Sequence, residues 1–198
     1  MKLNVVMLCD FFDPELAYQE GVLQKYFLSR GHDCTVVCAP KIDIFSYYKN
    51  KRNSTNDSYE NSSITRLNYR FKLYSLYLLK GIRRKLIELK PDLLFVHDIN
   101  LSLLIAAIYV RANPNCILIC DSHCDKSNSA KNFLSRVIFY KIIKKLIVRL
   151  TSSSVHQFYA VAPAGISFLH EMYSIPKDKI RLIPLCVEEK YVKHKIMT

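Results

Sequence analysis

The feature that most restricts the fold of this chain is an alternation of short apolar runs with longer amphipathic stretches. The apolar runs are rich in Val, Ile, Leu and Cys, as buried strands are, and they cover residues 3–9, 34–39, 93–97, 116–120, 158–161 and 180–184. Apolar residues at helical spacing fill most of the intervals, at 20–30, 69–89, 101–111, 131–150 and from Pro163 onward. This alternation predicts an α/β fold, a Rossmann-like parallel sheet of about six strands flanked by helices.

The length of 198 residues, half of them hydrophobic, suits one domain with a full core. We expect that domain to span residues 1–188, with 189–198 as the start of an interdomain linker and no second domain after it. No apolar run reaches the roughly 18 residues that cross a bilayer. Asp10 ends the first apolar run without a cleavage site after it, and seven cysteines, an odd number, suit a reducing compartment. We therefore expect a cytoplasmic domain.

Glycine is too scarce for the common phosphate-binding loops. The chain holds four glycines and neither a Gly-x-Gly-x-x-Gly nor a Gly-x-x-x-x-Gly-Lys-Ser/Thr sequence. An ordinary dinucleotide-dependent dehydrogenase and a P-loop ATPase are therefore excluded. The cysteines lack Cys-x-x-Cys spacing, and Cys116 and Cys120 lie within an apolar run, so the sequence predicts no metal site.

Ligands of open parallel sheets bind beyond the carboxyl ends of the strands, which directs attention to loops 10–19, 97–100 and 121–128. The last of these begins Asp121-Ser122-His123-Cys124-Asp125. An imidazole there can orient a hydroxyl or donate to a developing charge near neutral pH, and Asp121 or Asp125 can fix its tautomer. His97 and Asp98 end the third run in the same way. The alternatives are a solvated polar loop for His123 and a histidine satisfied by backbone for His97.

Several segments, taken in order, resemble the N-terminal half of family-4 glycosyltransferases of the GT-B type. They are Ser29-Arg30-Gly31-His32 followed by Thr35-Val36-Val37, then Lys90-Pro91-Asp92-Leu93-Leu94-Phe95-Val96-His97, and Ile175-Pro176-Lys177-Asp178-Lys179-Ile180-Arg181-Leu182-Ile183-Pro184. The resemblance covers nearly the whole chain. It implies an acceptor-binding domain of a retaining enzyme that moves a sugar from a nucleotide-sugar donor, without a further cofactor, in cell-envelope polysaccharide or glycolipid synthesis.

The resemblance also implies roles for individual residues. His123 corresponds to the histidine that contacts the sugar or acceptor near the reacting centre, and is our catalytic candidate. Leu16 and Ala17 lie in the loop that passes the donor diphosphate, although many relatives carry glycines there. The residues expected to bind the acceptor are Tyr18, Gln19, Glu20, His97, Asp98, Asp121, Asp125 and Asn128. The family's donor domain carries two glutamates seven residues apart, and no such pair occurs here, so we expect the chain alone to be inactive without a separate donor-binding domain.

The net charge of +12 predicts an anionic partner. Residues 131–150 carry six cations and no acid among large apolar side chains, a pattern typical of helices that lie on anionic membranes. We expect Lys141, Lys144 and Lys145 to face the inner surface of the plasma membrane, and the acceptor to be a saccharide or lipid-linked. The alternative is an ordinary solvated helix face. No array of aromatic residues with glycine suggests a nucleic-acid partner. A non-catalytic acceptor-binding or membrane-docking module is the rival function.

Overall fold

The computed structural model describes residues 1–14, 18–40, 63–73, 76–130, 133 and 135–185. Seven strands form one sheet in the order β3-β2-β1-β6-β7-β8-β9, and every neighbouring pair is parallel. The strands are β1 (Asn4–Cys9), β2 (Asp33–Cys38), β3 (Ile64–Arg66), β6 (Leu93–Val96), β7 (Ile117–Ser122), β8 (Gln157–Ala160) and β9 (Ile180–Leu182). The predicted α/β fold with a parallel sheet is therefore confirmed.

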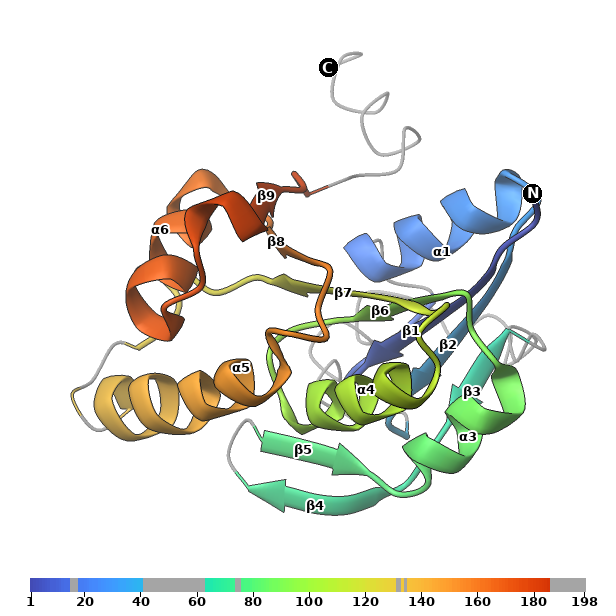
Figure 1. Ribbon diagram of the computed structural model, residues 1–198, viewed down its shortest axis with the longest axis horizontal. Coiled ribbons are helices and arrows are strands. Elements are labelled where there is room, and N and C mark those ends of the chain that lie inside the picture. The colour runs from blue at the N-terminus through green and yellow to red at the C-terminus, as the bar shows by residue number, and fades with distance from the viewer. Residues whose placement is uncertain (15–17, 41–62, 74–75, 131–132, 134, 186–198) are drawn as a thin grey trace, which may run out of the picture.

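Helices cover both faces of this sheet (Figure 1). The helix α1 (Gln19–Ser29) lies on one face, and α4 (Leu101–Ala112) and α5 (Lys145–Thr151) lie on the other. Further helices are α3 (Ile82–Leu89), α6 (Pro163–Tyr173) and the short 3-10 turn η4 (Lys177–Lys179). Gly31 takes the left-handed conformation just after α1, at a φ of 79°, which explains why a glycine ends this helix.

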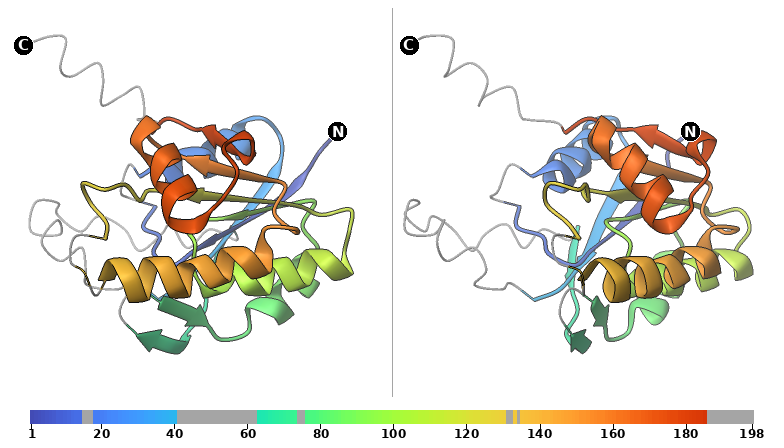
Figure 2. Two further views of the ribbon diagram at one scale, coloured as in Figure 1. Left: turned by 60° about the vertical axis from the view of Figure 1, so that its left-hand side comes forward. Right: turned by 90° about the vertical axis from the view of Figure 1, so that its left-hand side faces the viewer.

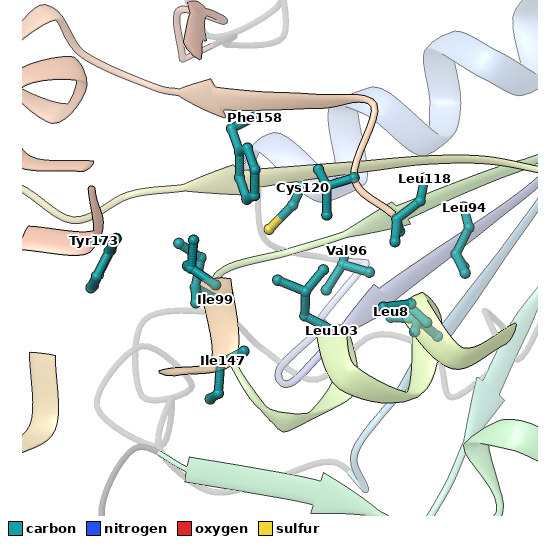
Figure 3. Packing of buried hydrophobic residues seen from close by; sticks show 14 of the residues in the cluster. Leu8, Leu94, Val96, Ile99, Leu103, Leu118, Cys120, Ile147, Phe158 and Tyr173 are labelled. Carbon is teal, nitrogen blue, oxygen red and sulfur yellow. The ribbon is translucent and has the colours of Figure 1, made fainter. Parts of the chain in front are cut away.

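The larger core lies between the sheet and α4, α5 and α6. Fully buried side chains from four strands meet Leu103 of α4 and Ile147 of α5 there (Figure 3). The smaller core lies under α1 and includes Val5, Met7 and Phe95. Because the strands are buried on both faces, their sequences are continuous apolar runs rather than alternating ones. These continuous apolar runs are the feature from which the strands could be predicted in the sequence.

The prediction of one helix over residues 69–89 is wrong. The segment forms an antiparallel hairpin, β4 (Tyr69–Leu73) and β5 (Leu76–Leu79), before α3 begins. In β4 the apolar residues alternate with Arg70 and Lys72, which is the two-residue period of a strand. Gly81, at a φ of 88°, then lets the chain turn into α3. The cations of this segment are consequently spread over a hairpin and a short helix and share no helical face.

The segment from Ser135 to Thr151 is continuous helix, as predicted, although its winding changes. Ser135–Lys144 is wound as a π-helix, η3, and Lys145 begins α5. Figure 2 shows α5 running alongside α4 below the sheet, and η3 continuing the same helix beyond α4. Within the described residues, no helix combines the length and the apolar composition needed to cross a membrane. The linker predicted at 189–198 lies outside the described residues.

Candidate functional site

Ionisable side chains from the ends of two strands, β6 and β7, and from the start of helix α1 meet at the carboxyl edge of the sheet. Glu20 Oε1 in the first turn of α1 lies 2.8 Å from His97 Nε2. On its other side, His97 Nδ1 lies 3.1 Å from Asp121 Oδ1. His123 Nε2 approaches Asp121 Oδ2 at 3.5 Å, and the two histidine rings meet edge to face with centroids 4.6 Å apart. We call these four residues the edge network.

The register of the parallel strands brings the edge network together. Val96 of β6 pairs with Cys120 of β7, so the next residues, His97 and Asp121, lie side by side. The backbone N–H of His97 donates to the Leu8 carbonyl of β1 at 2.9 Å, which holds the end of β6 against its other neighbour. Asp121 is buried, and the backbone N–H of Asp98 also donates to its Oδ1, at 3.1 Å.

Electrostatics favour a protonated His97 between two carboxylates. Burial opposes a charge on this imidazole, but Asp121 and Glu20 together raise the pKa of His97 well above its usual value. Burial likewise opposes the charge of Asp121, yet His97 and His123 hold the pKa of that carboxyl far below its usual range. The pKa of Glu20 is lowered in the same way, against burial, by its hydrogen bond to His97. The group is therefore a carboxylate–imidazolium–carboxylate chain.

An ion pair between the buried Lys144 and the partly exposed Asp98 lies beside the edge network. Lys144 Nζ, with only 2% of the side chain exposed, donates to Asp98 Oδ2 at 2.8 Å. Burial opposes both charges, but each partner favours the ionised form of the other, so the pKa of Lys144 is raised and that of Asp98 is lowered. Asp98 takes the left-handed conformation, at a φ of 61°, and also accepts from Ser122 Oγ at 3.3 Å. A non-glycine residue in that conformation at a strand end is uncommon and is often found at functional sites.

Lys144 is therefore not a membrane-facing cation, and that prediction is wrong. The sequence shows that residues 131–150 carry cations at helical spacing. It does not show that one of these side chains points into the protein and forms an ion pair there. An ammonium group can be buried only beside a compensating anion, and the anion here comes from a strand end 46 residues earlier. Lys141 and Lys145 are exposed, as predicted.

The sequence profile described as Glycosyltransferase Family 4 matches residues 22–191. This chain belongs to glycosyltransferase family 4. No curated protein sequence matches it significantly.

One solved structure resembles the fold of this family-4 domain with a TM-score above 0.5. A putative UDP-N-acetylglucosamine 2-epimerase from Listeria monocytogenes has 12% identity and a TM-score of 0.51, over 91% of this chain and 44% of that one. The UDP-GlcNAc 2-epimerase from Methanocaldococcus jannaschii has 13% identity and a TM-score of 0.49, over 92% and 45%. A glycosyltransferase from Rickettsia africae has 13% identity and a TM-score of 0.46, over 92% and 43%. The family-4 domain thus spans less than half the length of each of these proteins.

The other residues predicted to bind the acceptor differ in burial and in hydrogen bonding. The side chain of Gln19 is buried beside Glu20, and its amide atoms make no hydrogen bond within the described part of the chain. Tyr18 is exposed. Asp125 and Asn128 close their own loop, because Asp125 accepts from the Ser127 backbone and Asn128 Nδ2 donates to the His123 carbonyl at 2.7 Å. Asp121, rather than Asp125, is thus the carboxylate beside the His123 ring. Leu16 and Ala17 lie outside the described residues.

Three members of the edge network also have the composition of a metal-ligand set. Ligand atoms of Glu20, His97 and His123 lie within 4.8 Å of one another. Asp121 holds the far side of the His97 ring, as carboxylates do for metal-bound histidines. These residues come from three separate segments, so no spacing in the sequence reveals them. His97 and Glu20 already contact each other directly, and the expectation that the domain needs no metal stays a prediction.

Sequence reasoning missed Asp10 and Asn100 as parts of this edge. Asn100 Nδ2 donates to Asp10 Oδ2 at 2.6 Å, and Asn100 Oδ1 accepts from the Ser102 backbone, which caps α4. Burial, together with the negative charge of Asp98, raises the pKa of Asp10 to about 7. Asp10 directly follows the first strand, so the rule that pointed to His97 and Asp121 would have found it.

The raised pKa of Asp10 predicts a specific dependence of stability on pH. An aspartate in the unfolded chain titrates near 4, so between about pH 4 and 7 the native state holds a proton that the unfolded state has lost. The free energy of unfolding therefore falls as pH rises through this range. Because asparagine cannot ionise, Asp10→Asn should raise it relative to wild type by about 1–3 kcal/mol at pH 8 and by much less at pH 4.5. Urea unfolding at both pH values measures this, and an equal change at the two would contradict it.

Proposed function

We propose that this domain is the acceptor-binding half of a glycosyltransferase that moves a sugar from a nucleotide-sugar donor to an acceptor hydroxyl. The observation that supports this most is the edge network, because it places two histidines and two carboxylates where ligands of a parallel sheet bind. His123 Nε2 is buried and makes no hydrogen bond within the described residues. Its contact with Asp121 Oδ2 is long, at 3.5 Å, and we propose that a ligand hydroxyl pairs with this nitrogen.

The proposed role of the edge network is to hold the acceptor and the transferred sugar in place. Gln19 adds a buried amide whose atoms make no hydrogen bond within the described residues, and such groups gain most from a ligand that pairs with them. Asp98, Asp125 and Asn128 are proposed to bind further hydroxyl groups. From the family resemblance we infer retention of the sugar's configuration, and a role in cell-envelope polysaccharide or glycolipid synthesis.

We propose that the donor half of the active site comes from a separate domain, on the same polypeptide or on another. These 198 residues span less than half the length of the solved neighbours. Half of the transition-state environment would then be supplied by that second domain. The 198 residues alone should show no sugar transfer.

We also propose that the domain lies on the inner face of the plasma membrane through η3 and α5. Four large apolar side chains of this helix are exposed at intervals of four residues: Ile138, Ile142, Leu146 and Leu150. Lys141, Lys145 and Arg149 are exposed beside them. An apolar stripe with flanking cations and no acid fits an anionic membrane surface. This stripe is also the observation that favours the rival function, a membrane-docking module without catalysis.

The catalytic part of the proposal predicts the effect of His123→Ala. With a matching donor-binding domain present, sugar transfer should fall by about 100-fold, as is usual when one positioned acid–base or polar group is removed. Transfer is measured from a radiolabelled nucleotide sugar. His170→Ala is the matched control, because His170 is an exposed histidine on α6. If both variants retain activity within a factor of two of wild type, His123 has no part in the reaction.

The membrane part predicts the effect of Lys145→Gln combined with Arg149→Gln. At about 1 kcal/mol per cation near anionic lipid, this double variant should bind phosphatidylglycerol vesicles roughly 30-fold more weakly than wild type. Added salt should weaken wild-type binding, since exposed charges are screened over about 8 Å at physiological ionic strength.

The matched control for membrane binding is Lys177→Gln combined with Lys179→Gln, which removes two exposed cations from η4. In co-sedimentation with vesicles, the Lys145/Arg149 variant should lose binding, whereas the control variant should bind nearly as well as wild type. An equal loss of vesicle binding in both double variants would mean that net charge, rather than this helix, governs membrane binding. The domain would then have no membrane face at η3 and α5.

A further inference from the structure

A recess lies between the loop after β7, η3 and α6, and the residues that line it are not those of the edge network. Its volume is about 380 Å³, enough for a phosphate group with part of an attached chain. The loop that lines it runs from His123 at the edge network to Ala130, and the Asn128–His123 hydrogen bond closes that loop. We call this recess the loop pocket.

The floor of the loop pocket is apolar. Phe168 and Met172 of α6 and Ala130 of the loop line it, and all three are buried. Phe168 is part of the main core and is packed edge to face against Tyr140 and Tyr173, so this floor is rigid. An apolar wall of this kind favours hydrocarbon over water.

The rim of the loop pocket is cationic. Lys126, Arg136 and Lys141 line it, against one carboxylate, Glu171. Arg136 Nε donates to the Ala130 carbonyl at 3.2 Å, which fixes the guanidinium at the rim. Lys126 Nζ pairs with Glu171 Oε2 at 2.7 Å. Within the described residues Lys141 forms no ion pair, so the rim has two cations in excess.

We propose that the loop pocket binds a phosphate group attached to an apolar chain. The cations of the rim would donate to the phosphate oxygens, and the first carbons of the chain would lie on Met172 and Ala130, which keep a small exposed surface. The helix η3 supplies Arg136 and Lys141 and also the exposed Ile138 and Ile142, so the rest of the chain has an apolar path along the same element. This deepens the proposed function, on which it rests, by naming a lipid phosphate as the acceptor's anchor.

Because of the Lys126–Glu171 pair, two kinds of charge removal at the rim should change phosphate binding in opposite directions. Glu171 repels an anion and competes for Lys126, so removing its charge should strengthen phosphate binding. Removing the charge of Arg136 or Lys141 should weaken it. A pocket that merely collects apolar ligands would respond to neither change.

The test uses calorimetric titration of the purified chain with three soluble probes: inorganic phosphate, hexyl phosphate below its micelle concentration, and hexanol. Hexyl phosphate should bind at least about tenfold more tightly than either of the others, because each of these probes lacks one half of the interaction. The double variant Arg136→Gln with Lys141→Gln should bind hexyl phosphate about tenfold more weakly than wild type, or more weakly still. The variant Glu171→Gln should bind hexyl phosphate several-fold more tightly than wild type.

The matched control is Glu88→Gln, which removes the acid of a similar exposed pair, Lys85–Glu88, on α3. It should leave binding unchanged, and thermal unfolding should show that all variants stay folded. Equal binding of inorganic phosphate and hexyl phosphate would overturn the lipid assignment in favour of a free anion. No binding by wild type, or the same affinity in all variants, would overturn the pocket itself. Neither result depends on sugar transfer, so the proposed catalytic function is tested separately.

Discussion

Asp121 is a carboxylate removed from water at the end of a central strand, with 1% of the residue exposed. An isolated charge in such a place costs on the order of several kcal/mol, so it persists only where cations and donors surround it. His97 and the backbone N–H of Asp98 supply two of those contacts, and His123 lies close by. Because His97 also holds Glu20, one buried anion fixes the ends of β6 and β7 and the start of α1 relative to one another.

The Asp98–Lys144 pair extends this arrangement to the other face of the sheet. Asp98 follows His97 in the chain, yet its carboxylate pairs with the last residue of η3. The helix that carries the exposed apolar stripe is thereby joined to the strand end that carries His97. A partner that displaced η3 would act directly on Asp98, and through the Asp98 backbone on Asp121.

Much of the fold could be predicted because its strands are buried on both faces and are therefore continuous apolar runs. The rule that parallel sheets bind ligands at their carboxyl ends then led to His97, Asp121 and His123, which the structure brings together. The hairpin at Tyr69–Leu79 was missed although β4 has the two-residue period of a strand, because β4 and β5 are only five and four residues long and their apolar residues also fit helical spacing. The strand β3 was missed because three residues show no period.

The inward pairing of Lys144 could not be predicted, since it depends on a contact with Asp98 that no local pattern encodes. The same holds for the link between Glu20 and His97, which are 77 positions apart in sequence. Periodicity describes which face of an element is apolar. It does not describe which polar side chains meet when two elements pack.

An NMR titration of the ring nitrogens of His97 shows whether this residue is an imidazolium held between two carboxylates. Imidazoles without such partners titrate near 6.5. We expect His97 to keep its proton well above that pH, and Asp121→Asn to lower the pKa of His97, because Asp121 raises that pKa more than Glu20 does. A His97 ring that titrates near 6.5 in the wild-type protein, with no change in Asp121→Asn, would contradict this expectation.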